Sequence, residues 1–184
     1  MDVQNDFCPG GSLAVERGDE VARRISDWIA SRPADYDAVI ATMDWHPAPG
    51  GAEPFEHFAD EPDYVATWPA HCVRGTQGAE LHPHLVLPDD AVIVHKGEDA
   101  AAYSGFEGHD DEGRGLAAIL RAADVDAVDV VGLATDYCVK ATALDARREG
   151  FSVRVLSSMA AGVAPESTRQ AVEEMQSAGV TVEG

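Results

Sequence analysis

Three things are scarce in this sequence of 184 residues, and each scarcity excludes a class of protein. There is no run of about 18 apolar residues and no basic segment followed by an apolar one at the start, so we expect neither a membrane span nor a signal peptide. The 3 cysteines are an odd number without CxxC spacing, which disfavours a disulfide framework and favours a reducing compartment. We therefore expect a cytoplasmic protein.

Basic residues are also few, because 13 lysines and arginines stand against 33 acidic residues and give a formal net charge of -20. A surface of this charge repels nucleic acids and anionic lipids, so we expect neither nucleic acid nor membrane as a partner. No internal repeat or linker divides the chain. Its length suits a single domain over residues 1–184.

Short apolar runs alternate with helical patterns along the chain. Strands are expected at 37–43, 91–95, 127–133, 152–157 and 180–182. Amphipathic stripes lie between them, such as Val21, Ile25 and Ile29, and the last helix begins at Pro165 and ends before Gly179. This order predicts an α/β fold of three layers, α/β/α, with helices on both faces of an open, mainly parallel sheet.

Cys138 follows one of these strands and falls in the first turn of the next helical pattern. Free backbone N–H groups and the helix dipole favour a thiolate there, so we expect a thiol pKa below the usual value of about 8.5. A single cysteine that follows a buried strand in the sequence is more often an inert core residue than a nucleophile. However, Asp44, His46 and Lys96 also stand at strand ends, the edge where such sheets bind ligands.

Six segments in one order resemble nicotinamidases (pyrazinamidases) of the isochorismatase-like cysteine hydrolase superfamily. They are 2–15, 44–46, 68–76, 96–97, 103–108 and 134–139. The resemblance implies metal-dependent hydrolysis of nicotinamide, and also of pyrazinamide, to the acid and ammonia, a step of NAD salvage. It implies a triad of Asp2, Lys96 and Cys138, in which Asp2 takes the thiol proton, Lys96 holds the charges and Cys138 forms a thioester.

Further residues take roles by the same resemblance. The backbone N–H groups of Ala134 and Cys138 form an oxyanion hole, next to a cis peptide bond between Leu133 and Ala134. Flat side chains hold the planar ring of the substrate, although ordinary core packing is the alternative for each of them, above all for Phe7. The residues implied in substrate binding are Phe7, Trp68, Tyr103 and Ala134.

A second constellation offers carboxylate and imidazole ligands for one divalent transition metal: zinc, iron(II) or manganese. By the same resemblance, Asp44, His46 and His71 match metal ligands of the nicotinamidases. His57 matches a fourth ligand found in part of that family. A loop rich in proline and glycine, 47–54, separates His46 from His57 and leaves the geometry of that ligand open. Residues expected to be loop, surface or packing residues outside the site are His82, His84, His95, His109, Cys8 and Cys72.

The start of the sequence departs from the family pattern. Family members have six strands, and a short apolar strand in the middle of the sheet precedes the catalytic aspartate, whereas Met1 alone precedes Asp2 here. We expect roughly five to seven further residues of strand ahead of the sequence as written. Without them, the neighbouring strands lose ladder partners.

Three alternatives stay open. The chain could be a different hydrolase of the same superfamily, acting on another amide or on an enol ether, or a homologue whose catalysis is impaired by the short start. A non-catalytic binding protein is the alternative from another class. The expected partner is a small molecule, nicotinamide, and either a monomer or a homodimer fits the sequence.

Overall fold

The computed structural model describes residues 1–50, 57–64 and 66–184, so part of the loop 47–54 lies outside the described residues. Strand β1 (Ile40–Asp44) pairs in parallel with β2 (Val92–Lys96). Strands β3 (Ala127–Leu133), β4 (Ser152–Ala161) and β5 (Thr181–Glu183) form a second parallel sheet in that order. Each of the five overlaps a predicted strand, which confirms the parallel α/β class.

The strand ends differ from the prediction in ways that matter for the site. Strand β1 begins at Ile40 instead of residue 37, and β4 continues to Ala161 instead of residue 157. Asp44 and Lys96 are paired with each other as the last residues of β1 and β2, rather than loop residues beyond them. Their backbones are therefore held by the ladder, which places both side chains at the carboxyl edge of the sheet.

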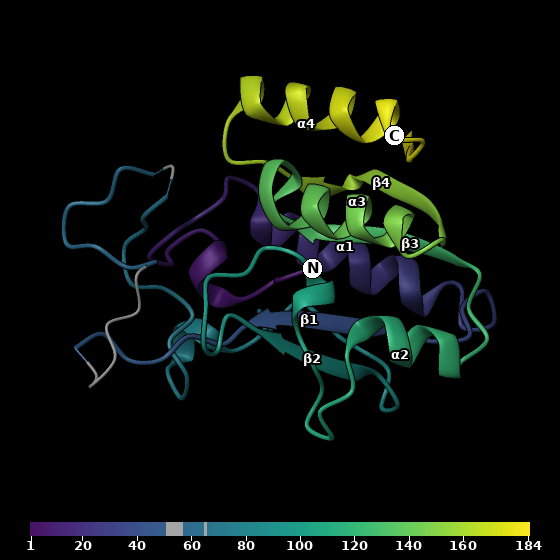
Figure 1. The fold of residues 1–184 in the computed structure, drawn as a ribbon, viewed down its shortest axis with the longest axis horizontal. Coiled ribbons are helices and arrows are strands. Elements are labelled where there is room, and N and C mark those ends of the chain that lie inside the picture. The colour runs from purple at the N-terminus through teal and green to yellow at the C-terminus, as the bar shows by residue number, and fades with distance from the viewer. Residues whose placement is uncertain (51–56, 65) are drawn as a thin grey trace.

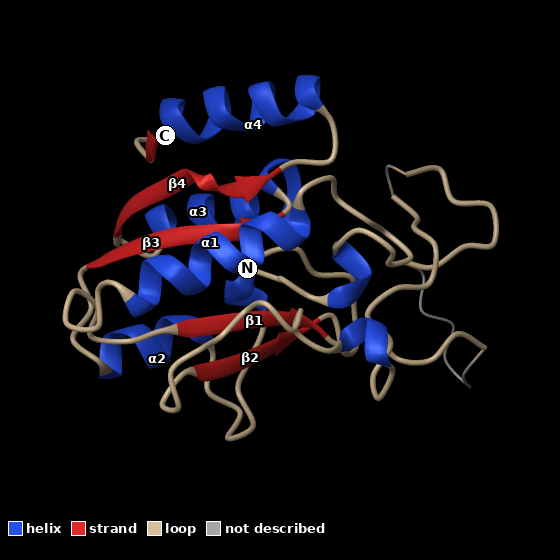
Figure 2. Cartoon of the chain, turned by 180° about the vertical axis from the view of Figure 1, so that it is seen from behind, coloured by secondary structure: helices blue, strands red, loops and turns tan. Residues whose placement is uncertain are grey.

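Helices cover both faces of the strands (Figures 1 and 2). Helix α1 (Gly18–Ala30) packs with Leu133 and Leu156 in one apolar cluster. Helices α2 (Leu116–Ala122), α3 (Lys140–Arg148) and α4 (Pro165–Ser177) contribute to a second cluster with Val155. Because adjacent strand residues point to opposite faces, Val155 and Leu156 separate the two clusters into the predicted three layers.

The described strands form two sheets, in agreement with the expected loss of ladder partners in the middle of the sheet. Met1 and Asp2 bridge them: the Met1 amino group donates to Val131 O at 2.8 Å, and Asp2 N donates to Thr42 O at 3.2 Å. Figure 1 shows the N-terminus between β1 and β3. A cavity of about 860 Å³, lined from both sheets, occupies the space between them. Among the described residues, no strand pairs with both β1 and β3, so the two sheets are separate.

A strand fused ahead of Met1 is expected to stabilise the protein. About six alternating valine and isoleucine residues would fill the cavity and give the facing edges of β1 and β3 a partner for their backbone N–H and C=O groups. We expect the free energy of unfolding to rise by about 2 kcal/mol or more, or roughly 4 to 8 °C in Tm. Chemical and thermal denaturation measure this effect.

The control is a fusion of equal length made of glycine and serine. Burial lowers the pKa of the Met1 amino group, and both fusions replace this group by an amide. Only the apolar fusion can add a strand with a hydrophobic face. Equal stability of the two fused proteins would show that the cavity does not accept a strand.

The described residues contain no helix with the length and apolar character needed to cross a lipid bilayer.

Candidate active site and metal centre

Three reactive side chains from distant parts of the sequence meet beneath the carboxyl edge of the strands. Lys96 Nζ lies 3.1 Å from Asp2 Oδ2 and 3.6 Å from Cys138 Sγ, and it also forms an ion pair with Asp44. Asp2 and Lys96 are each 1% exposed, and Cys138 is 6% exposed. The structure thus brings together the three residues that the sequence predicts as a triad.

The charges of this cluster depend on one another. Burial alone would lower the pKa of Lys96, but the Asp2 and Asp44 carboxylates outweigh burial and raise it. Burial would raise the pKa of Asp44, whereas the Lys96 ammonium keeps it well below its usual value. Lys96 and Asp44 are therefore ionised at neutral pH, each because of its neighbours.

The expected low pKa of the Cys138 thiol is wrong for this structure. Cys138 lies in a π-helical turn, Thr135–Val139, that leads into α3. Burial raises the pKa of the thiol well above its usual value; the Lys96 ammonium opposes this rise, and the Asp2 carboxylate adds to it. The prediction from the helix position had the opposite sign because it took no account of burial or of the nearby Asp2 and Asp44 carboxylates. A neutral thiol next to a carboxylate is the resulting arrangement.

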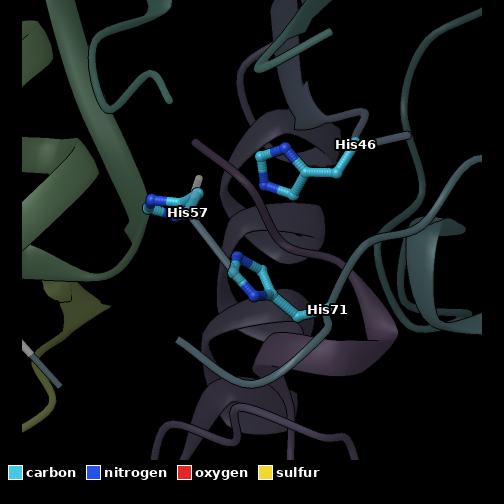
Figure 3. Close-up of side chains that lie close together, drawn as sticks. All are labelled: His46, His57 and His71. Atoms are coloured by element: carbon cyan, nitrogen blue, oxygen red, sulfur yellow. The ribbon is translucent and has the colours of Figure 1, made fainter. Parts of the chain in front are cut away.

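The predicted metal ligands also converge. The rings of His46, His57 and His71 face a common space in Figure 3, and their nitrogens lie within 4.8 Å of one another. Asp44 Oδ2 lies 3.5 Å from His46 Nε2 and 3.9 Å from His71 Nε2. Three buried imidazoles therefore lie together, and the buried Asp44 carboxylate adjoins two of them.

Backbone carbonyls set the tautomers of two of these histidines. His46 Nδ1 lies 2.9 Å from Gly97 O, and His71 Nδ1 lies 2.8 Å from Pro69 O. A carbonyl oxygen can only accept, so both rings donate from Nδ1 and present the Nε2 lone pair to the centre. This orientation by a second hydrogen bond is typical of metal-bound histidine, and the donor set therefore fits a divalent transition metal.

Gly97 makes the contact with His46 possible. It adopts φ of 75°, and a Cβ atom at this position would collide with the imidazole ring of His46. His46 is fixed from the other side as well, because its backbone N donates to Cys72 O at 3.0 Å and its carbonyl accepts from Arg74 N at 2.9 Å. The ring is therefore held by the backbone on both sides, independently of a bound ion.

His57 joins the centre although the loop before it includes residues outside the described part of the chain. Its ring centroid lies 5.5 Å from those of both His46 and His71. Burial, followed by the neighbouring His71 and His46 rings, lowers the pKa of His57 to about 4. The imidazole is thus neutral at neutral pH, which is the form that binds a metal.

A second group of possible ligands, Asp2, Asp44 and Cys138, also lies within 4.8 Å. The Lys96 ammonium contacts all three side chains of this group. A second cation placed there would be repelled by that buried positive charge. The histidine side of Asp44 is therefore the better place for a metal.

Aromatic side chains adjoin both centres. Trp68 Nε1 donates to the Tyr103 hydroxyl at 3.1 Å, and the Tyr103 ring lies 5.8 Å from that of His57. Phe7 packs in the apolar core, which was the alternative to a role in substrate binding. Its ring centroid also lies 5.4 Å from that of His71. The sequence prediction missed Tyr137, whose ring packs edge-on against Trp68 at 5.2 Å. Its position next to Cys138 was the available signal.

Two more buried polar residues escaped the sequence analysis. The Gln4 side chain accepts from Asp44 N at 2.8 Å and donates to Asp44 O at 2.8 Å, so it pairs with that residue as a strand would. The Thr42 hydroxyl donates to Asp2 Oδ1 at 2.6 Å. Thr42 stands two residues before Asp44 on β1, and this strand alternation was the only sequence signal.

The residues expected outside the site do lie outside it. His95 stacks on Trp45, and His109 lies 3.3 Å from Glu98. His82 and His84 contact each other. Cys8 and Cys72 are buried, and burial raises the pKa of the Cys8 thiol to about 11, which suits packing residues. The peptide bond between Leu133 and Ala134 is cis, as the resemblance implies.

Comparisons with known proteins agree in sequence and in fold. A family model described as the Isochorismatase domain matches residues 1–184. The nicotinamidase/pyrazinamidase of Mycobacterium tuberculosis is 51% identical over 180 residues, which cover 98% of this chain and 94% of that protein. The pyrazinamidase of Pyrococcus horikoshii in complex with zinc has a TM-score of 0.85 and 42% identity, covering 98% of this chain and 94% of that one. PnC1 from L. infantum in complex with nicotinate has a TM-score of 0.80 and 35% identity, covering 98% and 88%.

Proposed function

This chain belongs to the Isochorismatase domain family, and we propose that it hydrolyses nicotinamide to nicotinate and ammonia, with pyrazinamide as a second substrate. The observation that carries this proposal is the buried contact of Cys138 with both a carboxylate and an ammonium group. A nucleophile, a base and a fixed positive charge in one place are what hydrolysis of an amide through a covalent intermediate needs. The product is a pyridine carboxylate, so we assign the reaction to NAD salvage.

In the proposed reaction, Asp2 accepts the thiol proton of Cys138 while the sulfur attacks the amide carbon of the substrate. The backbone N–H groups of Ala134 and Cys138 donate to the oxyanion that forms. The C–N bond then breaks, Asp2 returns the proton to the leaving nitrogen, and ammonia departs. A thioester remains. Asp2 then takes a proton from the water that attacks the thioester. Asp2 returns this proton to the Cys138 sulfur, so the thiol is regenerated as nicotinate leaves.

The raised pKa of the Cys138 thiol supports Asp2 as the base. A thiol that is neutral at rest cannot attack until a neighbouring group removes its proton. Lys96 contacts both partners, so its charge stabilises the thiolate as it forms and holds the carboxylate in place. The burial of these three side chains also limits the access of bulk water to the reacting atoms.

We propose that Asp44, His46, His57 and His71 hold one divalent metal, and zinc, iron(II) and manganese all suit this donor set. The zinc complex of the Pyrococcus horikoshii pyrazinamidase supports this assignment. When bound, the metal supplies a Lewis-acid contact for the ring nitrogen of the substrate. The aromatic side chains of Trp68 and Tyr103 are placed to flank a planar ring beside it.

His46→Ala is expected to weaken zinc binding by more than roughly 100-fold, because it removes a ligand held in the correct tautomer. Titration against a chromophoric chelator measures the affinity without any need for enzyme activity. His109→Ala is the matched control: its side chain is 49% exposed and lies 3.3 Å from Glu98 and 3.4 Å from Asp110 O, neither of which is a proposed ligand, so its zinc affinity should equal that of the unaltered protein. Equal zinc affinity in both variants would contradict the proposed centre.

Ammonia release from three amides tests the substrate. Nicotinamide and pyrazinamide carry a ring nitrogen, and benzamide is the matched amide without one. With zinc, iron(II) or manganese supplied, we expect turnover of the first two and much slower turnover of benzamide. Folded protein that binds zinc but releases no ammonia from nicotinamide would refute the proposed activity, and equal turnover of benzamide would refute recognition of the ring nitrogen.

A further inference from the structure

The two oxygens of the Asp2 carboxylate have different surroundings. Oδ1 accepts the short hydrogen bond from the Thr42 hydroxyl at 2.6 Å. Oδ2 lies 3.1 Å from Lys96 Nζ, and among the described residues it has no hydrogen-bond donor with good geometry. The oxygen with remaining capacity to accept a proton is therefore Oδ2.

Thr42 is itself held firmly. It is 2% exposed on β1, and both its carbonyl and its hydroxyl oxygen accept from Asp2 N, at 3.2 and 3.3 Å. Its methyl group packs tightly against Gly105, where an added Cβ atom would lie 2.9 Å from Thr42 Cγ2. A β-branched side chain confined in this way keeps one rotamer, which aims the hydroxyl at Asp2.

The hydroxyl has one proton to donate. Its other neighbour is the Met1 sulfur at 3.4 Å, a weak acceptor compared with a carboxylate oxygen at 2.6 Å. The donation therefore goes to Oδ1. Without it, the carboxylate could turn about its Cβ–Cγ bond, since χ2 of aspartate is a soft torsion, and Lys96 would attract either oxygen equally.

We propose that Thr42 is a positioning residue for the amidase: its hydroxyl occupies Oδ1 of Asp2 and thereby directs Oδ2 to the thiol of Cys138. This role rests on the proposed function, in which Asp2 removes the thiol proton. Among the described residues, the side-chain hydrogen bond from Thr42 to the predicted triad goes to Asp2, so Thr42 acts through Asp2. A small error in the direction of a catalytic base is costly because proton transfer requires a near-linear approach.

Thr42→Val keeps the shape of the side chain and removes the donor, whereas Thr42→Ser keeps the donor and removes the methyl group. We expect Thr42→Val to lower kcat by roughly 10- to 100-fold with KM unchanged. Thr42→Ser should retain most of kcat. Circular dichroism and zinc affinity, both unchanged, would show that the two variants are folded.

Alkylation of Cys138 by iodoacetamide gives a readout that needs no amidase activity. The modified residue is identified by mass spectrometry of peptides, which separates it from the buried Cys8 and Cys72. Thr42→Val should slow this alkylation, and Thr42→Ser should not. In an Asp2→Asn background the slowing should vanish, because a residue that acts through Asp2 has no effect once the carboxylate is gone.

Three results would overturn the proposal: unchanged kcat and alkylation rate in Thr42→Val, equal loss in Thr42→Ser, or undiminished slowing in the Asp2→Asn background. The proposed function fails separately. If the unaltered protein releases no ammonia from nicotinamide but Thr42→Val still slows alkylation in an Asp2-dependent way, the positioning role stands and the substrate assignment falls.

Discussion

Cys138→Ala is expected to reduce ammonia release from nicotinamide by about 10⁴-fold or more. The sulfur is the atom that forms the covalent intermediate, and no neighbouring group can replace it: Asp2 and Lys96 could still act as base and charge, but nothing would attack the amide carbon. The change removes one buried atom, and the metal ligands remain. We therefore expect zinc affinity and the unfolding transition to change little while turnover disappears.

Cys8→Ala is the matched control for this variant. Cys8 is 1% exposed in the apolar cluster under α1, and burial raises the pKa of its thiol to about 11. Cys8→Ala removes the same atom from another buried cysteine, whereas the observed lysine contact is made by Cys138. Turnover should persist in Cys8→Ala. Residual turnover in Cys138→Ala near that of the control would exclude the thioester route.

Lys96→Met is expected to destroy activity and to lower the free energy of unfolding by about 3 to 5 kcal/mol at neutral pH. Methionine fills a similar volume without the charge, so in the metal-free protein the Asp2 and Asp44 carboxylates would remain buried without the Lys96 ammonium to compensate them. Removing one partner of a buried ion pair costs more than the pair itself contributes, because the desolvation of the other partner is left uncompensated.

Lys140→Met is the matched control on the surface. Lys140 Nζ lies 3.2 Å from Glu174, and the two side chains are 30% and 57% exposed. An ion pair in that setting contributes about 0 to 1 kcal/mol, so this variant should unfold almost as the unaltered protein does. Equal destabilisation by both substitutions, measured by urea unfolding, would mean that the buried charges near Cys138 are not coupled as described.

The decrease in the free energy of unfolding caused by Lys96→Met should also depend on pH. The pKa of Asp44 is lowered in the folded protein, so its contribution is present above the unfolded value of about 3.9 and is lost as pH falls through the lowered value. The pKa of Lys96 is raised, so its contribution is present below about 10.4 and is lost at higher pH. The difference between the two proteins should thus be largest between these limits. It should shrink in acid, where the variant's carboxyl groups take up protons.

Some features followed from local patterns in the sequence, because they depend on neighbouring residues. Alternating apolar runs and amphipathic stripes predicted the parallel α/β class, and motif order predicted the family that the comparisons confirm. The identities of the side chains that carry chemistry were likewise readable. In combination at the strand ends, where such sheets bind ligands, carboxylates, imidazoles, a lysine and a thiol indicate a catalytic or metal-binding site.

Other features depended on residues far apart in the chain. The pKa of Cys138 was predicted in the wrong direction, since desolvation and the nearby carboxylates arise only when Asp2 and Asp44 are packed against it. The roles of Thr42 and Gln4 come from hydrogen bonds across 40 positions of sequence, for which strand alternation gave at most a signal at Thr42. The gap between β1 and β3 is also a property of the tertiary structure, and it agrees with the expectation that neighbouring strands lose ladder partners there.

By itself, then, the amino-acid sequence determined the fold class, the family and the list of reactive groups, all of which are properties of residue type and local order. Only the tertiary structure decided which nitrogens of His46 and His71 face the proposed metal site, which oxygen of Asp2 is left to take a proton, and why a lysine can stay charged in the interior. The physical reason is that these properties are set by hydrogen bonds and charges within a few ångströms, and folding brings such partners together irrespective of their distance in sequence.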